Sequence, residues 1–343
     1  MARHKNIPIF IAHRGCPNQC VFCNQKTIAE EKTQTLDEIR QTIEIALSHQ
    51  KADDEMEIAF FGGSFTGIPK EEMCSLLELA KEYLDSGRIV GIRLSTRPDY
   101  ISRNILDLLA SYGVSDIELG VQSLSDKVLL ACKRGHTAEA TLSACRLIKE
   151  YGIFRLVGQI MLGLPEATRE DEVATAKVLL DLPVDAIRIY PTVVLQDTPL
   201  ACTFARGGYS PLSIKEAVSQ AADILEMTLK RGVPCLRIGL CENESLHSQN
   251  GIVAGAFHPA MGELVFSEIY LRRMISILDS VDCKEKEIQF IIPEGSLSMA
   301  IGHKKSNLHH LYARYQPKHI RFTQSKDLKS FEIFLQEDHT IAP

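Results

Sequence analysis

The regular alternation of strand-like and helix-like segments restricts the fold of this chain more than any other feature of its sequence. Six short β-rich runs, separated by helical runs, precede residue 232, and a possible seventh strand follows at 235–240. Such alternation builds parallel sheets through right-handed crossovers. The sequence therefore predicts an α/β fold, a full or partial TIM-like (βα) barrel. The six predicted strands are 7–15, 56–63, 89–96, 116–123, 154–162 and 186–194.

Capping residues predict where the intervening helices begin and end. Thr35 and Glu38 form a capping box, and Ser213 and Glu216 form another. Thr137 is placed to cap a further helix, which is expected to end near a glycine. The predicted helices are 35–49, 70–84, 101–112, 137–151, 169–180 and 213–232.

The pattern changes after Asp282. A strand at 287–293, a helical stretch at 297–315 interrupted at Gly302, and strands at 319–323 and 331–335 predict a small α+β unit. We therefore divide the chain into a barrel domain, 1–283, and a basic C-terminal domain, 284–343. Residues 284–329 carry a net charge of +5, which leaves −11 for the rest of a chain whose net charge is −6. The basic module indicates a polyanionic partner or, alternatively, a solvated basic face.

Composition indicates an ordinary globular protein, with 45% hydrophobic and 24% charged residues. There is no apolar run of about 18 residues, and the first residues do not read as a signal peptide, so we expect a cytoplasmic protein without membrane contact. In that compartment the ten cysteines are expected to be thiols and not disulfides. Three of them cluster tightly near the N-terminus.

The cluster reads C-P-N-Q-C-V-F-C and comprises Cys16, Cys20 and Cys23, just after the first predicted strand. Closely spaced thiolates commonly hold iron–sulfur clusters, and three protein ligands leave one iron open to a small molecule. Two alternatives remain at this point. Zinc is one, with His13 as a possible fourth ligand, and three unconnected thiols is the other.

This spacing, its position after the first strand and the aromatic Phe22 resemble the radical S-adenosylmethionine (SAM) superfamily. The resemblance implies a [4Fe–4S] cluster on Cys16, Cys20 and Cys23, with SAM bound to the open iron through its amino and carboxylate groups. It also implies reductive cleavage of SAM to a 5′-deoxyadenosyl radical that attacks the substrate, with the protein positioning these groups.

FFGGSFTG (60–67) ends the second predicted strand and is similar to the glycine-rich motif of that superfamily, which receives the SAM amino group. The matching residues are Gly62, Gly63 and Ser64. Glycines there allow a ligand to approach the backbone closely. Many members have Glu where this chain has Ser64.

Further motifs, in serial order, resemble the radical SAM domain of the Elongator catalytic subunit family. They are LSTRPDYI (94–101), IELGVQSLSD (117–126), KRGHT (133–137), MLGLPEAT (161–168), YPTVVLQDTPL (190–200) and GGYSP (207–211). The resemblance implies that Ser95, Gln122 and Arg134 lie near the SAM ribose and carboxylate, and that the backbone at Leu162 lies near the adenine.

Two departures from that family limit what is carried over. Elongator has a wider gap between its first two cluster cysteines, and it carries an acetyltransferase domain for which the roughly 80 residues after 265 leave no room. The compact cysteine spacing is closer to oxygen-independent coproporphyrinogen oxidase. Cys202, Cys235 and Cys241 match no spacing for a second cluster.

IIPEGSLSMAIGHKKSNLHHL (291–311) resembles a KH domain, whose Gly-x-x-Gly loop clamps about four nucleotides of single-stranded RNA. Lys305 replaces the second glycine of that loop. The resemblance implies RNA contacts, and the alternative is a basic cap that binds nothing. The implied RNA-binding residues are Gly302, Lys304, Lys305, Arg314 and Arg321.

These features together predict a radical SAM enzyme, of transferase or oxidoreductase class, that modifies RNA, with tRNA the leading candidate. Its expected partners are RNA and an electron donor such as ferredoxin or flavodoxin. Two alternatives stay open: radical chemistry on a small molecule such as coproporphyrinogen, and a zinc- or cluster-bearing RNA-binding protein without turnover.

Overall fold

The computed structural model describes residues 3–11, 15–16, 20–24, 34–240, 251–281 and 283–336. Contacts divide the chain into two compact units. The barrel unit comprises Met1–Ala217 and Met227–Phe257, and the C-terminal unit comprises Val218–Glu226 and His258–Pro343. The functional boundary at residue 283 stays a prediction, while the contacts group the residues from His258 onward with the C-terminal unit.

One seven-stranded sheet forms the centre of the barrel unit, and every neighbouring pair of its strands is parallel. The strand order is β1-β2-β3-β4-β5-β6-β8. Because β1 and β8 are the two edges of this sheet, the predicted α/β barrel is confirmed in its partial form. The strands are β1 (Arg3–Ile11), β2 (Asp54–Gly62), β3 (Gly91–Thr96), β4 (Val114–Gln122), β5 (Arg155–Leu162), β6 (Ala186–Pro191) and β8 (Cys235–Ile238).

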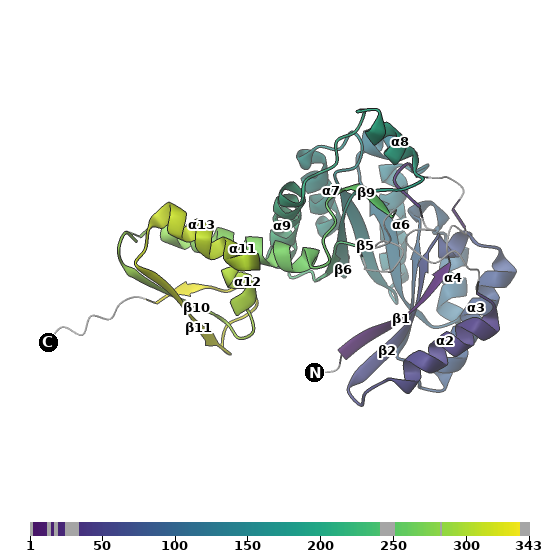
Figure 1. Ribbon diagram of the computed structural model, residues 1–343. Helices are drawn as coiled ribbons and strands as arrows, with labels where there is room; N and C mark the ends of the chain where they lie inside the picture. The colour runs from purple at the N-terminus through teal and green to yellow at the C-terminus, as the bar shows by residue number, and fades with distance from the viewer. Residues whose placement is uncertain are drawn as a thin grey trace. The chain divides into compact units, whose positions relative to one another are not determined.

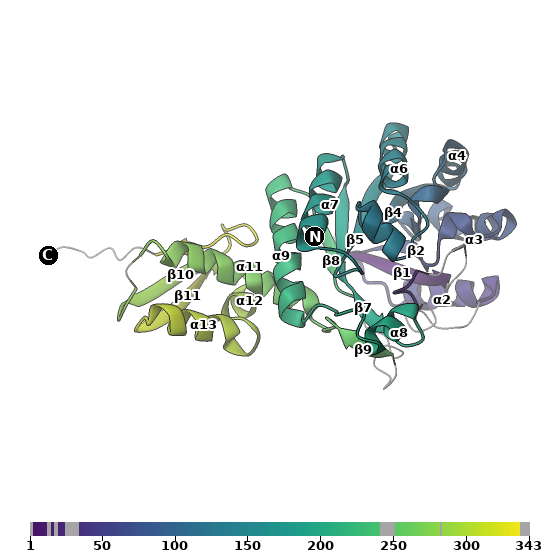
Figure 2. The ribbon, with the colours of Figure 1, turned by 90° about the horizontal axis from the view of Figure 1, so that it is seen from above.

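Helices follow the strands and form an arc around the sheet, as Figure 2 shows for α2, α3, α4, α6 and α7. Both predicted capping boxes are present, at the starts of α2 and α9, and Gly152 and Gly232 end α6 and α9 in the left-handed conformation. The helices are α2 (Leu36–Ser48), α3 (Lys70–Asp85), α4 (Arg103–Ser111), α5 (Asp126–Ala131), α6 (Ala138–Tyr151), α7 (Arg169–Asp181), α8 (Pro199–Ala205) and α9 (Ile214–Arg231), with short 3-10 turns η1 (Phe65–Gly67) and η2 (Pro98–Tyr100).

The two faces of the sheet differ in chemistry, because side chains alternate along each strand. One face packs apolar side chains against the helices, and Gly158 there faces Leu179 of α7. The other face carries charged residues in ion pairs. Arg93 Nη2 lies 3.1 Å from Asp116 Oδ1, and Arg188 Nε lies 2.9 Å from Glu118 Oε2. The inner face is therefore a polar lining for whatever the partial barrel holds.

Two short strands, β7 (Val193–Leu195) and β9 (Ile252–Gly255), pair antiparallel beside the main sheet. Leu240 and Phe257 pack against the buried Val193 and Leu195. In the described part of the chain no helix combines the length and the apolar character needed to cross a bilayer.

The C-terminal unit has a three-stranded sheet of order β11-β10-β12, in which β10 runs parallel to β11 and antiparallel to β12. Figure 1 shows α11 and α13 on one face of this sheet. The strands and the helical stretch broken at Gly302 match the sequence prediction. The elements are α11 (Met261–Leu278), β10 (Glu287–Pro293), α12 (Leu297–Ile301), η3 (His303–Lys305), α13 (Ser306–Tyr315), β11 (His319–Ser325) and β12 (Phe334–Leu335).

Helix α11 was not among the predicted elements, for a physical reason. Its N-cap, Ala260, makes no side-chain capping hydrogen bond, and Gly262 lies in its first turn. Its buried side chains include Val265, Ile269 and Met274, yet no strongly polar face alternates with them. Without a cap or an amphipathic pattern, the sequence lacks the two usual signals of a helix.

Candidate functional site

Glycines fix the loop that carries the first cysteine. Gly15 has φ +71°, and a Cβ there would lie 2.1 Å from the Ser64 carbonyl oxygen. A Cβ on Gly67 would lie 2.3 Å from the Gly15 carbonyl oxygen. The loop therefore packs backbone against backbone on the segment after β2, which only glycine allows. This contact holds Cys16 beside the carboxyl end of β2.

Backbone hydrogen bonds tie the rest of the cysteine loop to the barrel unit. The Val21 N–H donates to the Cys132 carbonyl at 3.1 Å, and the Leu200 N–H donates to the Val21 carbonyl at 2.9 Å. Phe22 packs on the apolar cluster of Val21, Val128, Cys132 and Leu164. This apolar wall shields the pocket from water on one side.

The three thiols lie on this one loop and differ in exposure: Cys20 is buried, and Cys16 and Cys23 are partly buried. Burial, reinforced by the neighbouring Cys20 and Cys16 thiols, raises the pKa of Cys23 to about 12. Burial also raises the pKa of Cys16, while the positive charge of Arg134 opposes that rise. Metal-free thiols of this kind are protonated at neutral pH and release protons when they bind metal.

Within the described ranges, no three His, Cys, Asp or Glu side chains form a group that could hold a metal ion. His13, the possible fourth zinc ligand, lies outside the described residues, as does Cys241.

Two buried guanidinium groups border the thiols. Arg134 is 8% exposed, its Nη1 lies 3.6 Å from Cys20 Sγ, and its Nη2 donates to the Gly120 carbonyl at 2.7 Å. Arg97 is 2% exposed and binds Asp99 through Nε and Nη2 at 2.9 and 2.8 Å. Arg134 Nε and Arg97 Nη1 have no acceptor among the described residues.

The two N–H groups without acceptors bear on whether a [4Fe–4S] cluster and SAM fit beside the thiols. A buried N–H without an acceptor is costly, and a buried cation without a counterion is more so. Thiolates, a negatively charged cluster and the carboxylate of SAM would supply the missing acceptors and counter-charge. The donor set therefore fits the group that the sequence motif implies.

The glycine-rich segment after β2 meets the cysteine loop at its backbone. Gly62 has φ +107°, and the Gly63 N–H donates to the Ile11 carbonyl at 2.8 Å. Ser64 is fully buried, with its Oγ 2.9 Å from Thr96 Oγ1 and accepting the Arg97 N–H at 3.2 Å. The Ser64 hydroxyl, at the position where many superfamily members have Glu, is thus hydrogen-bonded to Thr96 of β3 and to the Arg97 backbone.

The remaining predicted SAM contacts gather at the carboxyl ends of β3, β4 and β5. Gln122 ends β4 with φ +66°, and its Oε1 accepts from Gln159 Nε2 at 2.8 Å. Ser95 is half-buried near the end of β3. Leu162 is fully buried at the end of β5, and its carbonyl accepts the Thr192 N–H at 2.8 Å. The structure therefore brings these residues to the same edge as the cysteines.

Sequence reasoning missed the group around Arg97. The His136 side chain is fully buried, with Nδ1 3.9 Å from Asp99 Oδ1. Burial, followed by the positive charge of Arg134, lowers its pKa to about 4, so it is neutral at pH 7. The sequence does carry a signal for this group, because Arg97 and Asp99 follow directly after a predicted strand. Both belong to the LSTRPDYI motif, in which the sequence analysis predicted a role only for Ser95.

The predicted RNA contacts fall into two groups. Gly302, Lys304 and Lys305 lie on one loop, where both lysines are exposed and left-handed, with φ +51° and +63°. Arg314 and Arg321 instead face carboxylates: Arg314 Nη2 lies 2.7 Å from Asp279 Oδ1, and Arg321 Nη2 lies 3.5 Å from Glu287 Oε2. The loop is thus the better-placed candidate.

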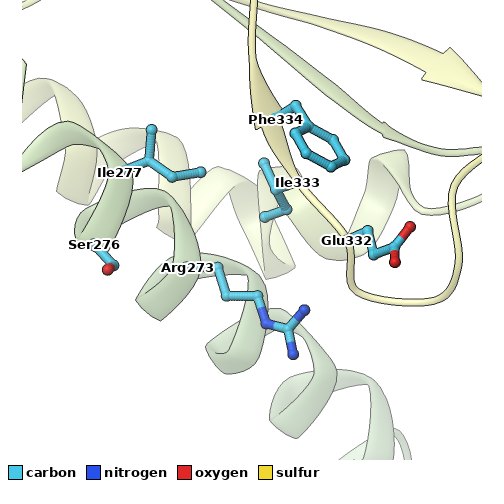
Figure 3. A pocket seen from close by; sticks show the side chains of 6 residues that line it. All are labelled: Arg273, Ser276, Ile277, Glu332, Ile333 and Phe334. Atoms are coloured by element: carbon cyan, nitrogen blue, oxygen red, sulfur yellow. The ribbon is translucent and has the colours of Figure 1, made fainter.

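An open pocket of about 310 Å³ also lies in the C-terminal unit, between α11 and the segment that leads into β12 (Figure 3). It contains none of the residues predicted to be functional. Its lining comprises Arg273, Ser276, Ile277, Glu332, Ile333 and Phe334.

Two family models match consecutive parts of this chain. The family model described as the radical SAM superfamily matches residues 10–179, and a radical SAM C-terminal domain matches residues 184–271. An uncharacterized protein of Methanocaldococcus jannaschii is 30% identical over 232 residues, which cover 64% of this chain and 70% of that protein.

Two further similarities point toward Elongator-type proteins. A tRNA uridine(34) acetyltransferase of Methanocaldococcus infernus is 33% identical over 43% of this chain, but the match spans only 27% of that enzyme. The solved structure of the archaeal Elongator protein 3 of M. infernus, lacking its N-terminus, matches with a TM-score of 0.59 at 20% identity. That match covers 84% of this chain and 66% of that one, and it shows the shared fold.

The matched regions include the cysteine loop, the glycine-rich segment and the strand ends described above. On these grounds the chain belongs to the radical SAM superfamily of enzymes, a family that implies a [4Fe–4S] cluster and SAM.

Proposed function

We propose that this enzyme holds a [4Fe–4S] cluster through Cys16, Cys20 and Cys23 and cleaves SAM reductively to modify RNA, with tRNA the leading candidate. The observation that carries the first half is a group of three thiols bordered by two buried guanidinium groups, each with one nitrogen that lacks an acceptor among the described residues. When bound, the cluster and SAM supply a 5′-deoxyadenosyl radical. The residues proposed to hold SAM are Phe22, Gly62, Gly63, Ser64, Ser95, Gln122, Arg134 and Leu162.

The chain's own side chains have distinct tasks in this proposal. Arg134, held by the Gly120 carbonyl, presents a fixed positive charge to the carboxylate of SAM. Gly62 and Gly63 leave backbone atoms open to close approach. Phe22 and its apolar neighbours exclude water, which would otherwise screen these charges and quench a radical.

The RNA half of the proposal rests on the C-terminal unit. Elements β10, α12, α13 and β11 follow one another in the β-α-α-β order that a KH domain requires. Lys305 adopts φ +63°, a conformation that favours glycine, at the position of the second glycine of a Gly-x-x-Gly loop. The tRNA choice draws support from the relatives whose names specify tRNA uridine(34) as their target.

The first test is anaerobic reconstitution with iron and sulfide, followed by addition of SAM and dithionite. We expect four irons and four sulfides per chain and formation of 5′-deoxyadenosine. Zinc without inorganic sulfide in anaerobically purified protein, or no 5′-deoxyadenosine from fully loaded protein with or without tRNA, would contradict the proposal.

The second test separates RNA from small-molecule substrates. The double variant Lys304→Gln, Lys305→Gln in the full chain should weaken binding of single-stranded RNA and lower the salt slope by about 1.4, because each phosphate contact contributes about 0.7. Lys326→Gln with Lys329→Gln removes the same charge elsewhere in the unit and is the matched control. Equal effects of the two double variants would show that Lys304 and Lys305 make no specific contribution to RNA binding. A tRNA nucleoside whose mass changes when the gene is deleted would identify the substrate.

A further inference from the structure

Among the residues that the structure describes, Arg97 is the largest whose side chain is buried almost completely, at 2% exposure. Asp99 satisfies two of its nitrogens through a bidentate pair, but Nη1 has no acceptor in the described chain. The Asp99 side chain is itself 27% exposed, so water screens its charge and weakens its attraction for the Arg97 guanidinium. A buried guanidinium with an orphaned N–H indicates a further anion that the polypeptide does not supply.

Arg97 reaches the cysteine pocket through Ser64. The Ser64 carbonyl packs against Gly15, the residue before Cys16, and the Ser64 Oγ accepts the Arg97 backbone N–H. The ring of Tyr100 lies beside the Arg97 guanidinium, with its centroid 5.8 Å from Cζ. That ring also contacts Gly67, which packs on the Gly15 backbone. Arg97 is therefore enclosed by the same segments that position Cys16.

The Arg97 guanidinium thus lies beside the segments that position Cys16, where its charge can act on a group held by the thiols. A four-iron cluster on three thiolates carries net negative charge, which increases by one when the cluster accepts an electron. A fixed nearby cation stabilises the more negative state, and net charge and hydrogen bonds to sulfur are among the factors that set cluster potentials.

We propose that Arg97 is a positioning residue that raises the reduction potential of the cluster, with Asp99 setting how much of its charge the cluster experiences. This inference rests on the proposed cluster at Cys16, Cys20 and Cys23. The step concerned is transfer of one electron from a donor of the ferredoxin or flavodoxin class, or from dithionite, which is oxidised while the cluster is reduced. No covalent bond changes in this step.

The experiment is a redox titration of the reconstituted full chain without SAM, followed by electron paramagnetic resonance. We expect Arg97→Gln to disfavour reduction about tenfold or more, a shift of about 59 mV to more negative potential for one electron. Asp99→Asn should shift the potential in the opposite direction, and Arg97→Lys should shift it less than Arg97→Gln. Arg93→Gln is the control, because Arg93 lies four residues earlier on β3, roughly 13 Å away, paired with Asp116.

The outcomes separate this inference from the proposed function. A wild-type protein without iron and sulfide would overturn the cluster itself. A loaded protein in which the Arg97 and Asp99 variants shift the potential in the same direction, or leave it unchanged, would overturn only the inference. Weaker SAM binding in Arg97→Gln at an unchanged potential would overturn it as well, and would assign Nη1 to the SAM carboxylate. If Arg97→Gln does not fold, the upward shift expected for Asp99→Asn tests the inference alone.

Discussion

The cysteine pocket of the barrel unit and the loop of the C-terminal unit both present positive charge, but they do so by opposite means. In the pocket, Arg97 and Arg134 are buried and lack part of their acceptors. On the loop, Lys304 and Lys305 are exposed to solvent. A buried cation needs a permanent counterion, whereas an exposed cation binds and releases a polyanion in a salt-dependent way. The difference in burial is what the proposed function requires, with a resident cofactor at the first site and an exchanging polyanion at the second.

Removing a thiol should give the largest effect, and it tests the resident half of this comparison. We expect Cys20→Ala to abolish cluster binding and 5′-deoxyadenosine formation, because Cys20 is the buried middle ligand of the three. Cys145→Ala removes an equally buried thiol on α6 and should leave iron, sulfide and turnover unchanged. If the Cys20→Ala variant still bound four irons and four sulfides per chain, the cysteine pocket would not be the site of a resident cluster.

The loop should be most sensitive at its one crowded glycine. A Cβ on Gly302, at φ +84°, would lie 2.5 Å from Ser306 Oγ and 2.8 Å from the Asn307 backbone nitrogen. We expect Gly302→Ala to lower the unfolding free energy of the C-terminal unit by about 4 kcal/mol, from left-handed strain and overpacking combined.

Gly295→Ala is the matched control for that substitution. Gly295 lies in the same unit with φ +79°, but a Cβ there would meet nothing within 4 Å. It should therefore cost only the backbone strain, about 1–2 kcal/mol. Equal losses for the two variants in denaturant unfolding would show that packing around Asn307 does not shape the loop.

Acid should act on the pocket through His136. The pKa of this side chain falls from 6.5 to about 4 on folding, so the unfolded chain binds more protons between these values. Stability is therefore complete above pH 6.5 and is lost as the pH falls toward 4, by about 3 kcal/mol in total. Denaturant unfolding of cluster-free protein across this range should show the loss, and His136→Gln should not show it. Identical pH profiles would refute this origin of acid sensitivity.

The smallest effect is expected for Lys305→Gly, which distinguishes the contribution of loop conformation from that of loop charge. Lys305→Gly relieves a left-handed side chain at φ +63° and should raise the stability of the C-terminal unit by up to about 1 kcal/mol. It also removes one cation, so the salt slope of RNA binding should fall by about 0.7. An unchanged slope would show that Lys305 contributes conformation alone.

Local signals predicted most of the fold. Thr35 with Glu38 and Ser213 with Glu216 form the capping boxes expected of them, and β10 has the predicted bounds. The signals failed at α11, where Ala260 provides no cap. They also placed the first strand at 7–15, four residues later than β1 (Arg3–Ile11), because its register is set by pairing with β2.

Part of the candidate site could be predicted in the same way, because spacing along the chain reveals cysteines and glycines. The position of Cys16, Cys20 and Cys23 after a strand is readable in sequence. The burial of Arg97 and the hydrogen bonds of Ser64 are not, because they depend on contacts between strand ends that lie far apart in the chain. The electrostatic environment of the thiols therefore becomes visible only once the strands are assembled into the sheet.

The placement of β1 at one edge of the sheet has a consequence for how easily this strand opens. Among the described strands, β1 pairs along its nine residues, from Arg3 to Ile11, with β2 alone, whereas β3 and β4 each have neighbours on both sides. Local opening costs less free energy where a segment has fewer contacts. The amide protons of this strand are therefore expected to exchange with solvent sooner than those of the central strands.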